Sequence, residues 1–165
     1  MKKLVLAFAV RNEGTRLYGK PLQNLDIQNK FCVLDNIIEN VKKLDCVNSI
    51  VLGISDGEEN KDYINYALRN GIKYIIGDKT DVLSRLIKCA KLENATDVYR
   101  ITSESPFPYT KLLNDAWIEH CKSNNDATFL DEIIDGCGFE IIKLSALEKS
   151  HNYGDDRHRS ELCTQ

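Results

Sequence analysis

The sequence predicts an α/β fold in which a mostly parallel β-sheet carries helices on both faces. Short apolar runs rich in β-branched residues alternate along the chain with segments whose apolar residues recur at helical spacing. Such alternation is typical of β-α-β units, whose crossover helices must pack on the two faces of a parallel sheet. The expected strands are 4–10, 49–54, 73–76, 97–102, 127–130 and 139–143.

The expected helices lie between these strands. Apolar residues recur at helical spacing over 33–44, 82–90 and 112–117, and the segment 58–70 is followed by Gly71, a residue that commonly ends a helix. The 165 residues suit one domain, and no repeat, low-complexity run or linker rich in Pro, Gly or Ser interrupts them. We therefore expect a single domain over residues 1–165.

Composition argues against several classes of protein. The 22 Lys and Arg residues are scattered among 25 Asp and Glu residues, so we expect no nucleic-acid partner. No apolar stretch approaches the roughly 18 residues that a membrane span needs. The apolar run 4–10 lacks the cleavage pattern of a signal peptide, and the six cysteines form no C-x-x-C pair. We therefore expect a soluble, cytoplasmic protein with reduced thiols and no membrane partner.

The segment after the first strand is the strongest candidate for a site, because ligands of such folds sit at the carboxyl ends of the strands. Residues 11–20 hold three cations, Arg11, Arg16 and Lys20, with two glycines and the hydroxyl of Thr15. Guanidinium and ammonium groups bind phosphate oxygens and stabilise charge that develops at phosphorus. Glycines let the backbone approach those oxygens. The segment therefore predicts a site for a nucleoside triphosphate.

Residues 11–20 allow two other interpretations. Residues 14–20 match the G-x-x-x-x-G-K part of a P-loop, but Pro21 stands where a Ser or Thr would ligate magnesium, and it has no hydroxyl or backbone N–H. We therefore reject a P-loop ATPase. A solvated turn with incidental charges is the other alternative, and the position directly after the first strand disfavours it.

Residues 11–22, R-N-E-G-T-R-L-Y-G-K-P-L, resemble the long N-terminal signature of the sugar cytidylyltransferases. That family includes the acylneuraminate and 3-deoxy-octulosonate cytidylyltransferases and spore-coat polysaccharide proteins. The segments 77–85, 100–107 and 138–142 are similar to further motifs of the family, in its order, and the similarity extends to 157–161. The resemblance covers nearly the whole chain.

The resemblance implies a Rossmann-like nucleotidyltransferase fold and transfer of CMP from CTP to an acidic sugar or phosphorylated acceptor, with release of pyrophosphate and help from Mg²⁺. It implies catalytic roles for Lys20 and Arg16, and nucleotide contacts for Arg11, Thr15 and Gly19. It also implies a role in surface-glycan biosynthesis and a homodimer.

Two residues depart from the family pattern. Tyr18 replaces the proline usual before Gly-Lys, which loosens the loop or gives the nucleotide a ring to lie against. Glu104 occupies the position of the family's metal-binding aspartate. Glutamate is also a hard oxygen ligand but one methylene longer, so magnesium binds there only if the site shifts to admit it.

Three further residues either contact the nucleotide or have an ordinary structural role. Ser55 follows the second strand, where the family places a base or ribose contact, but Ser55, Asp56 and Gly57 are also ordinary turn residues. Asp81 and Arg85 match family positions for nucleotide contact. Their i,i+4 spacing equally predicts a helical ion pair, and Asp81 suits the first turn of a helix.

The acceptor side is predicted from Glu140, Arg157 and His158. Glu140 resembles a glutamate that the family carries near the acceptor, although a charged residue on an edge strand is an alternative. Arg157 and His158 lie in an acidic and basic cluster that binds an anionic acceptor or forms a solvated ion-pair patch. His120 is expected only to cap the end of a helix.

The chain ends at Gln165, some tens of residues before the usual end of this family, which leads us to expect a truncated or minimal form. A non-catalytic descendant that binds a nucleotide or a partner chain is therefore the alternative to an enzyme. A glycosyltransferase ranks last, because no acidic segment supplies a D-x-D motif at a strand end.

Overall fold

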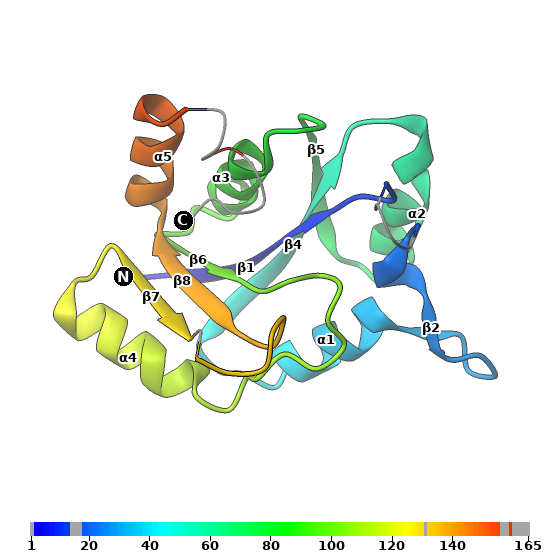
Figure 1. The fold of residues 1–165 in the computed structure, drawn as a ribbon, viewed down its shortest axis with the longest axis horizontal. Coiled ribbons are helices and arrows are strands. Elements are labelled where there is room, and N and C mark those ends of the chain that lie inside the picture. The colour runs from blue at the N-terminus through cyan, green and yellow to red at the C-terminus, as the bar shows by residue number, and fades with distance from the viewer. Residues whose placement is uncertain (1, 14–17, 131, 156–158, 160–165) are drawn as a thin grey trace.

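A computed structural model describes residues 2–13, 18–130, 132–155 and 159, and it confirms the predicted α/β fold (Figure 1). Six strands form one sheet in the order β5-β4-β1-β6-β8-β7. The pairs of β1 with β4, β1 with β6 and β4 with β5 are parallel, whereas β8 runs antiparallel to both of its neighbours. The strands are β1 Leu4–Val10, β4 Val47–Ser55, β5 Lys73–Gly77, β6 Asp97–Arg100, β7 Ala127–Leu130 and β8 Phe139–Lys143.

Helices cover both faces of the sheet. Successive side chains of β1 point to opposite faces, so Leu4, Leu6 and Phe8 pack with one helical layer while Val5 and Ala7 pack with the other. The first layer holds α1, α2 and α4, and the second holds α3 and α5 (Figure 1). The helices are α1 Val33–Val41, α2 Lys61–Arg69, α3 Val82–Leu92, α4 Leu113–Ser123 and α5 Leu144–Tyr153.

The predicted strands recur with small changes at their ends, while one small sheet was not predicted. β2, Asn24–Asp26, and β3, Phe31–Cys32, form a hairpin of two short strands before α1. Strands of three and two residues are too short for an alternating apolar pattern to reveal them. The hairpin connects the first loop to α1.

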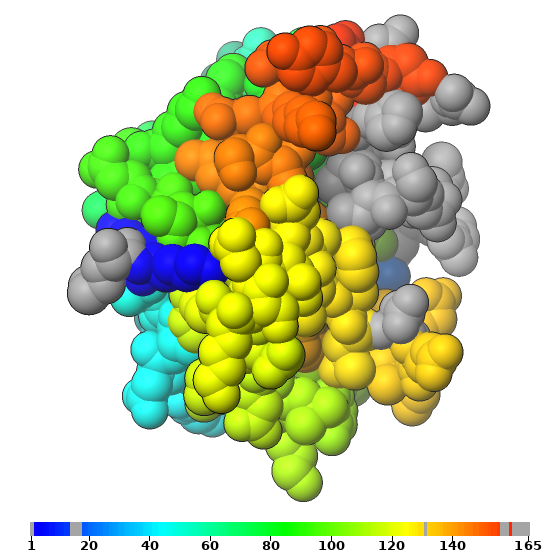
Figure 2. Space-filling model, turned by 90° about the vertical axis from the view of Figure 1, so that its left-hand side faces the viewer, coloured from blue at the N-terminus to red at the C-terminus, as the bar shows by residue number. Residues whose placement is uncertain are grey.

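The interpretation of Glu140 as a residue of an edge strand is wrong. β8 lies between β6 and β7, so both of its edges are paired, and the register places Glu140 opposite Arg100 of β6 and Phe129 of β7. The strand at this edge of the sheet is β7, which Figure 2 shows in yellow beside α4, with the orange α5 above it.

The expectation that His120 caps a helix end is also wrong. α4 continues to Ser123 and ends at Asn124 in the left-handed conformation, with φ +52°. His120 is fully buried instead, with Nε2 3.0 Å from Asp97 Oδ1 and Nδ1 2.8 Å from Thr128 Oγ1. Trp117 stacks on its ring. The imidazole thus ties α4 to β6 and β7.

None of the described helices is long and apolar enough to cross a membrane. In the described part of the chain Cys32, Cys46, Cys89, Cys121 and Cys137 are free thiols. Burial raises the pKa of Cys89 to about 12, so this thiol behaves as a small apolar side chain.

Replacing His120 by Ala should lower the free energy of unfolding by about 3 kcal/mol, because the change leaves a cavity and removes a buried partner of Asp97. Urea unfolding followed by circular dichroism measures this. Asn114→Ala, an exposed change on the same helix, is the control. Equal stabilities of the two variants would show that the buried contact is not stabilising.

Candidate functional site

The first loop is closed at its base by one backbone hydrogen bond. The Gly19 N–H donates to the Asn12 carbonyl at 2.9 Å, and Gly19 has φ +58°. A Cβ at Gly19 would lie 3.1 Å from Asn12 Oδ1, so glycine suits this position both by conformation and by space. The chain then enters a 3₁₀ turn, Lys20–Leu22, in which Pro21 is buried. Of the predicted loop residues, Thr15 and Arg16 lie outside the described residues.

The same loop is anchored to the turn that follows β4. The backbone N–H of Asn12 donates to Asn60 Oδ1 at 2.8 Å, and the Asn12 side-chain amide donates to the Glu59 carbonyl. Both asparagines are at most 2% exposed. Tyr63 of α2 donates its hydroxyl to the Arg11 carbonyl at 3.1 Å. The loop base is therefore held by buried hydrogen bonds, which are costly to break.

Lys20 lies beside Glu104, from the segment that follows β6. Lys20 Nζ is 3.4 Å from Glu104 Oε2, and both side chains are about half exposed. Ser103 donates its hydroxyl to the Ala9 carbonyl at 3.2 Å, which holds this segment against β1. The structure thus brings together the predicted catalytic cation and the predicted metal ligand at the carboxyl ends of β1 and β6.

The surroundings of Glu104 fit a magnesium ion only if most of its ligands come from a substrate. Among the described residues no three His, Cys, Asp or Glu side chains lie together as a metal site. Mg²⁺ is commonly held by one or two carboxylates together with substrate phosphates and water. The single exposed carboxylate of Glu104 suits that mode of binding and does not suit a site built from protein ligands alone.

Ser55 and the segment after β5 form a compact turn. The backbone N–H of Asp56 donates to the Gly77 carbonyl at 2.8 Å, and Ser55, 2% exposed, donates its hydroxyl to the Lys79 carbonyl at 3.5 Å. Asp78 Oδ1 accepts from the backbone N–H groups of Thr80 and Asp81. These bonds agree with the turn interpretation of Ser55, whose contact with a nucleotide remains a prediction.

The ion pair expected between Asp81 and Arg85 is replaced by other contacts. Asp81 caps α3 by accepting from the Ser84 N–H at 2.8 Å, and its other oxygen is 2.8 Å from His151 Nε2 of α5. Asp81 therefore links the segment after β5 to α5. Asp81 is the N-cap residue of α3, so it lies one position before the first helical turn in which it was expected.

Arg85 is buried between two strand ends. Its Nη1 donates to the Val10 and Gly53 carbonyls, each at 3.1 Å, and the residue is 1% exposed. A Cβ on Gly77 would lie 2.7 Å from Arg85 Cγ, so the glycine makes room for this side chain. Burial, followed by the charge of Arg11, lowers the pKa of the guanidinium. Its position makes Arg85 a support of β1 and β4, while its predicted nucleotide contact stays untested.

On the predicted acceptor side, Glu140 pairs with Arg100. Arg100 Nη1 lies 2.5 Å from Glu140 Oε2, and the two side chains are 23% and 19% exposed. Arg100 and Glu140 are the last paired residues of β6 and β8, at the carboxyl end of β6. Arg157 and His158 lie outside the described residues. The structure places Arg100 beside the predicted acceptor residue Glu140; its segment, 100–107, was noted in the sequence, but no role was predicted for it.

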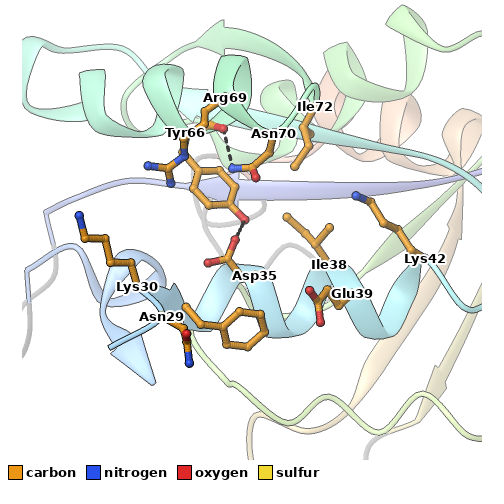
Figure 3. Close-up of a pocket in the computed structure, with 11 residues that line it drawn as sticks. Asn29, Lys30, Asp35, Ile38, Glu39, Lys42, Tyr66, Arg69, Asn70 and Ile72 are labelled. Atoms are coloured by element: carbon orange, nitrogen blue, oxygen red, sulfur yellow. Dashed lines mark hydrogen bonds between the residues drawn. The ribbon is translucent and has the colours of Figure 1, made fainter. Parts of the chain in front are cut away.

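A hollow of about 350 Å³ lies away from these strand ends, between α1 and α2 (Figure 3). Tyr66 of α2 donates its hydroxyl to Asp35 of α1 at 2.7 Å across it. The other Asp35 oxygen accepts from the Cys32 N–H at 2.8 Å. These contacts connect the two helices, and none of the described residues of the loop after β1 lines the hollow.

Comparisons with known proteins confirm the resemblance in sequence and fold. No family model matches the chain. The chain is 25% identical over 163 residues to an uncharacterised protein of Methanocaldococcus jannaschii, covering 98% of this chain and 65% of that protein. It is 23% identical over 164 residues to the spore coat polysaccharide biosynthesis protein SpsF of Bacillus subtilis, covering 92% and 67%. The chain thus spans about two thirds of these relatives' length.

Solved structures define the class of fold as that of the nucleotidyltransferases. A cytidylyltransferase from Leptospira borgpetersenii superposes with a TM-score of 0.86 at 22% identity, covering 99% of this chain and 70% of that chain. A CMP-2-keto-3-deoxy-manno-octonic acid synthetase in complex with CTP superposes with a TM-score of 0.72 at 10% identity, covering 93% and 79%. The chain therefore has the Rossmann-like α/β fold of the cytidylyltransferases.

Replacing Arg85 by Met should lower the free energy of unfolding by about 2 kcal/mol, because the Val10 and Gly53 carbonyls lose a buried donor. Chemical denaturation measures the change. Lys88→Met, an exposed charge removal on the same helix, should stay within about 0.5 kcal/mol of wild type. Identical midpoints for the two variants would contradict a supporting role for Arg85.

Proposed function

We propose that the chain is a cytidylyltransferase that transfers CMP from CTP to an acidic sugar or phosphorylated acceptor and releases pyrophosphate. The observation that carries this proposal is the position of Lys20 beside Glu104, where the loop after β1 meets the segment after β6. A cation and a hard anionic ligand at one strand-end site are what a metal-bound triphosphate needs.

In this reaction an acceptor oxygen attacks the α-phosphorus of CTP. A new P–O bond forms, the bond to the β-phosphate oxygen breaks, pyrophosphate leaves and the acceptor hydroxyl proton passes to solvent or a base. Lys20, with Arg11 and Arg16 from the same loop, would bind the phosphates and stabilise the charge that develops there. The loop base, fixed by Gly19 and Asn12, would keep these cations in place.

Glu104 would hold Mg²⁺ on the nucleotide, and the ion would neutralise phosphate charge when bound. Its carboxylate now lies 3.4 Å from Lys20 Nζ. We infer that the triphosphate separates this pair, because phosphate oxygens are the stronger partners of Lys20 and the metal is the stronger partner of Glu104. Lys20 and Glu104 would then already be in position, and each would exchange its present ionic partner for the phosphate or the metal.

The acceptor would lie toward β8, where Glu140 pairs with Arg100. A guanidinium at this place suits an acceptor that carries a carboxylate or phosphate. We propose that the reaction serves surface-glycan biosynthesis. The relative SpsF supports this, because it is named as a spore coat polysaccharide biosynthesis protein. The choice of CTP is supported by the solved complex of the synthetase with CTP. Cytoplasmic location, contacts by Arg157 and His158, and a homodimer belong to the same proposal.

The experiment that tests this function is a pyrophosphate-release assay with CTP, UTP, GTP and ATP. Each is combined with Mg²⁺ and a panel of acidic and phosphorylated sugars, and nucleotide binding is followed by calorimetry. We expect release with CTP and at least one anionic acceptor. Binding of none of the four nucleotides would overturn the proposal.

Lys20→Ala should lower kcat/KM for CTP by roughly a hundredfold or more, because a cation positioned on the reacting phosphates is removed. The assay above measures it. The control is Lys43→Ala, an exposed lysine after α1, which should leave the rate unchanged. An unchanged rate in Lys20→Ala would remove this residue from the catalytic machinery.

Glu104→Gln should abolish the strengthening of CTP binding by Mg²⁺ while leaving metal-free binding within about twofold, because the neutral amide is a poorer magnesium ligand. Calorimetry with and without Mg²⁺ measures both affinities. If wild-type binding is itself indifferent to Mg²⁺, the non-catalytic binding protein becomes the better description of this chain.

A further inference from the structure

Lys79 connects the segment after β5 to both neighbouring strand ends. Its Nζ lies 3.1 Å from Glu13 Oε1 and 3.0 Å from Glu59 Oε1. Glu13 belongs to the loop after β1, and Glu59 belongs to the 3₁₀ turn Glu58–Asn60 after β4. One ammonium therefore joins the carboxyl ends of β1, β4 and β5, where the nucleotide site is proposed.

Hydrogen bonds hold the backbone of Lys79 and of the residues around it in place. Its carbonyl accepts from Ser55 Oγ, a buried group, at 3.5 Å. The residues around it are fixed by Asp78, whose Oδ1 accepts from the Thr80 and Asp81 N–H groups at 2.8 Å. The backbone on both sides of Lys79 is thus fixed by hydrogen bonds, which places its ammonium within reach of both glutamates.

The two carboxylates contact the parts that build the phosphate loop. Glu13 follows Asn12 directly and precedes the glycine of the loop signature. Glu59 accepts from the Asn12 side chain through its own carbonyl. Any shift of these two glutamates would therefore be transmitted to the base of the loop.

The negative charges of Glu13 and Glu59 affect how a triphosphate would bind. Two carboxylates at the edge of a phosphate site repel the ligand unless a cation neutralises them. Lysine is charged at neutral pH, and the hydrogen bonds to Glu59 and then Glu13 raise the pKa of Lys79 further. Lys79 therefore offsets negative charge that would oppose the nucleotide.

We propose that Lys79 is a positioning residue for nucleotide binding, which neutralises Glu13 and Glu59 and holds them in place beside the phosphate loop. This inference rests on the proposed function. Lys79 acts here through the two glutamates and makes no contact with the reacting phosphorus. Removing the glutamate charges should therefore remove the need for Lys79.

The test is a mutant cycle with CTP affinity measured by calorimetry. Lys79→Met should weaken CTP binding by about five- to tenfold and raise KM more than it lowers kcat, because the unneutralised carboxylates repel the nucleotide before chemistry begins. Lys79→Arg should restore most of the affinity, since the guanidinium also reaches both carboxylates. Lys88→Met, an equal change of charge on α3, is the control and should bind CTP like wild type.

The deciding variant combines Glu13→Gln with Glu59→Gln. In this neutral background Lys79→Met should change CTP affinity by less than about twofold. An equal loss in both backgrounds would overturn the inference and make Lys79 a direct ligand of the phosphates. Wild-type protein that binds none of the four nucleotides would overturn the proposed function as well, whereas binding without this coupling overturns the inference alone.

Discussion

The parallel pairing of β1 with β4 is the constraint on which the rest of the structure depends. Their register runs from Leu4 to Val10, so both strands end at the same edge of the sheet and leave backbone carbonyls there. Arg85 satisfies two of them, Val10 and Gly53, from within the core. A buried guanidinium is costly, and these carbonyls offset that cost while they lock α3 under the two strand ends.

Several ion pairs lie at this edge of the sheet. Lys20 faces Glu104, Lys79 faces Glu13 and Glu59, and Arg100 faces Glu140. The exposed pairs of Lys20 with Glu104 and of Lys79 with Glu13 contribute little to folding stability, whereas the pair of Arg100 with Glu140 is mostly buried. In the proposed function these pairs would preorganise the site, because a triphosphate with a bound metal would take over Lys20 while Glu104 would turn to the metal.

The sequence predicted the regular elements well because each carries its own pattern. The runs 127–130 and 139–143 recur with the same bounds in β7 and β8, and Gly71 ends its helix with φ +62°. The hairpin of β2 and β3 was missed, since a pairing of such short strands depends on the loop and α1 beside it. His120 was misjudged because its partners Asp97 and Thr128 are distant in sequence or on another element.

Within the candidate site, the sequence by itself pointed to the loop after β1. Its cations, its glycines and its place directly after a buried strand are local features, and they pointed to Lys20 and Gly19. Only the tertiary structure decided which groups meet that loop. Glu104 is 84 residues from Lys20 along the chain, and Lys79 is 66 residues from Glu13. Such contacts are created when parallel strands bring their ends to one edge, and no local pattern records them.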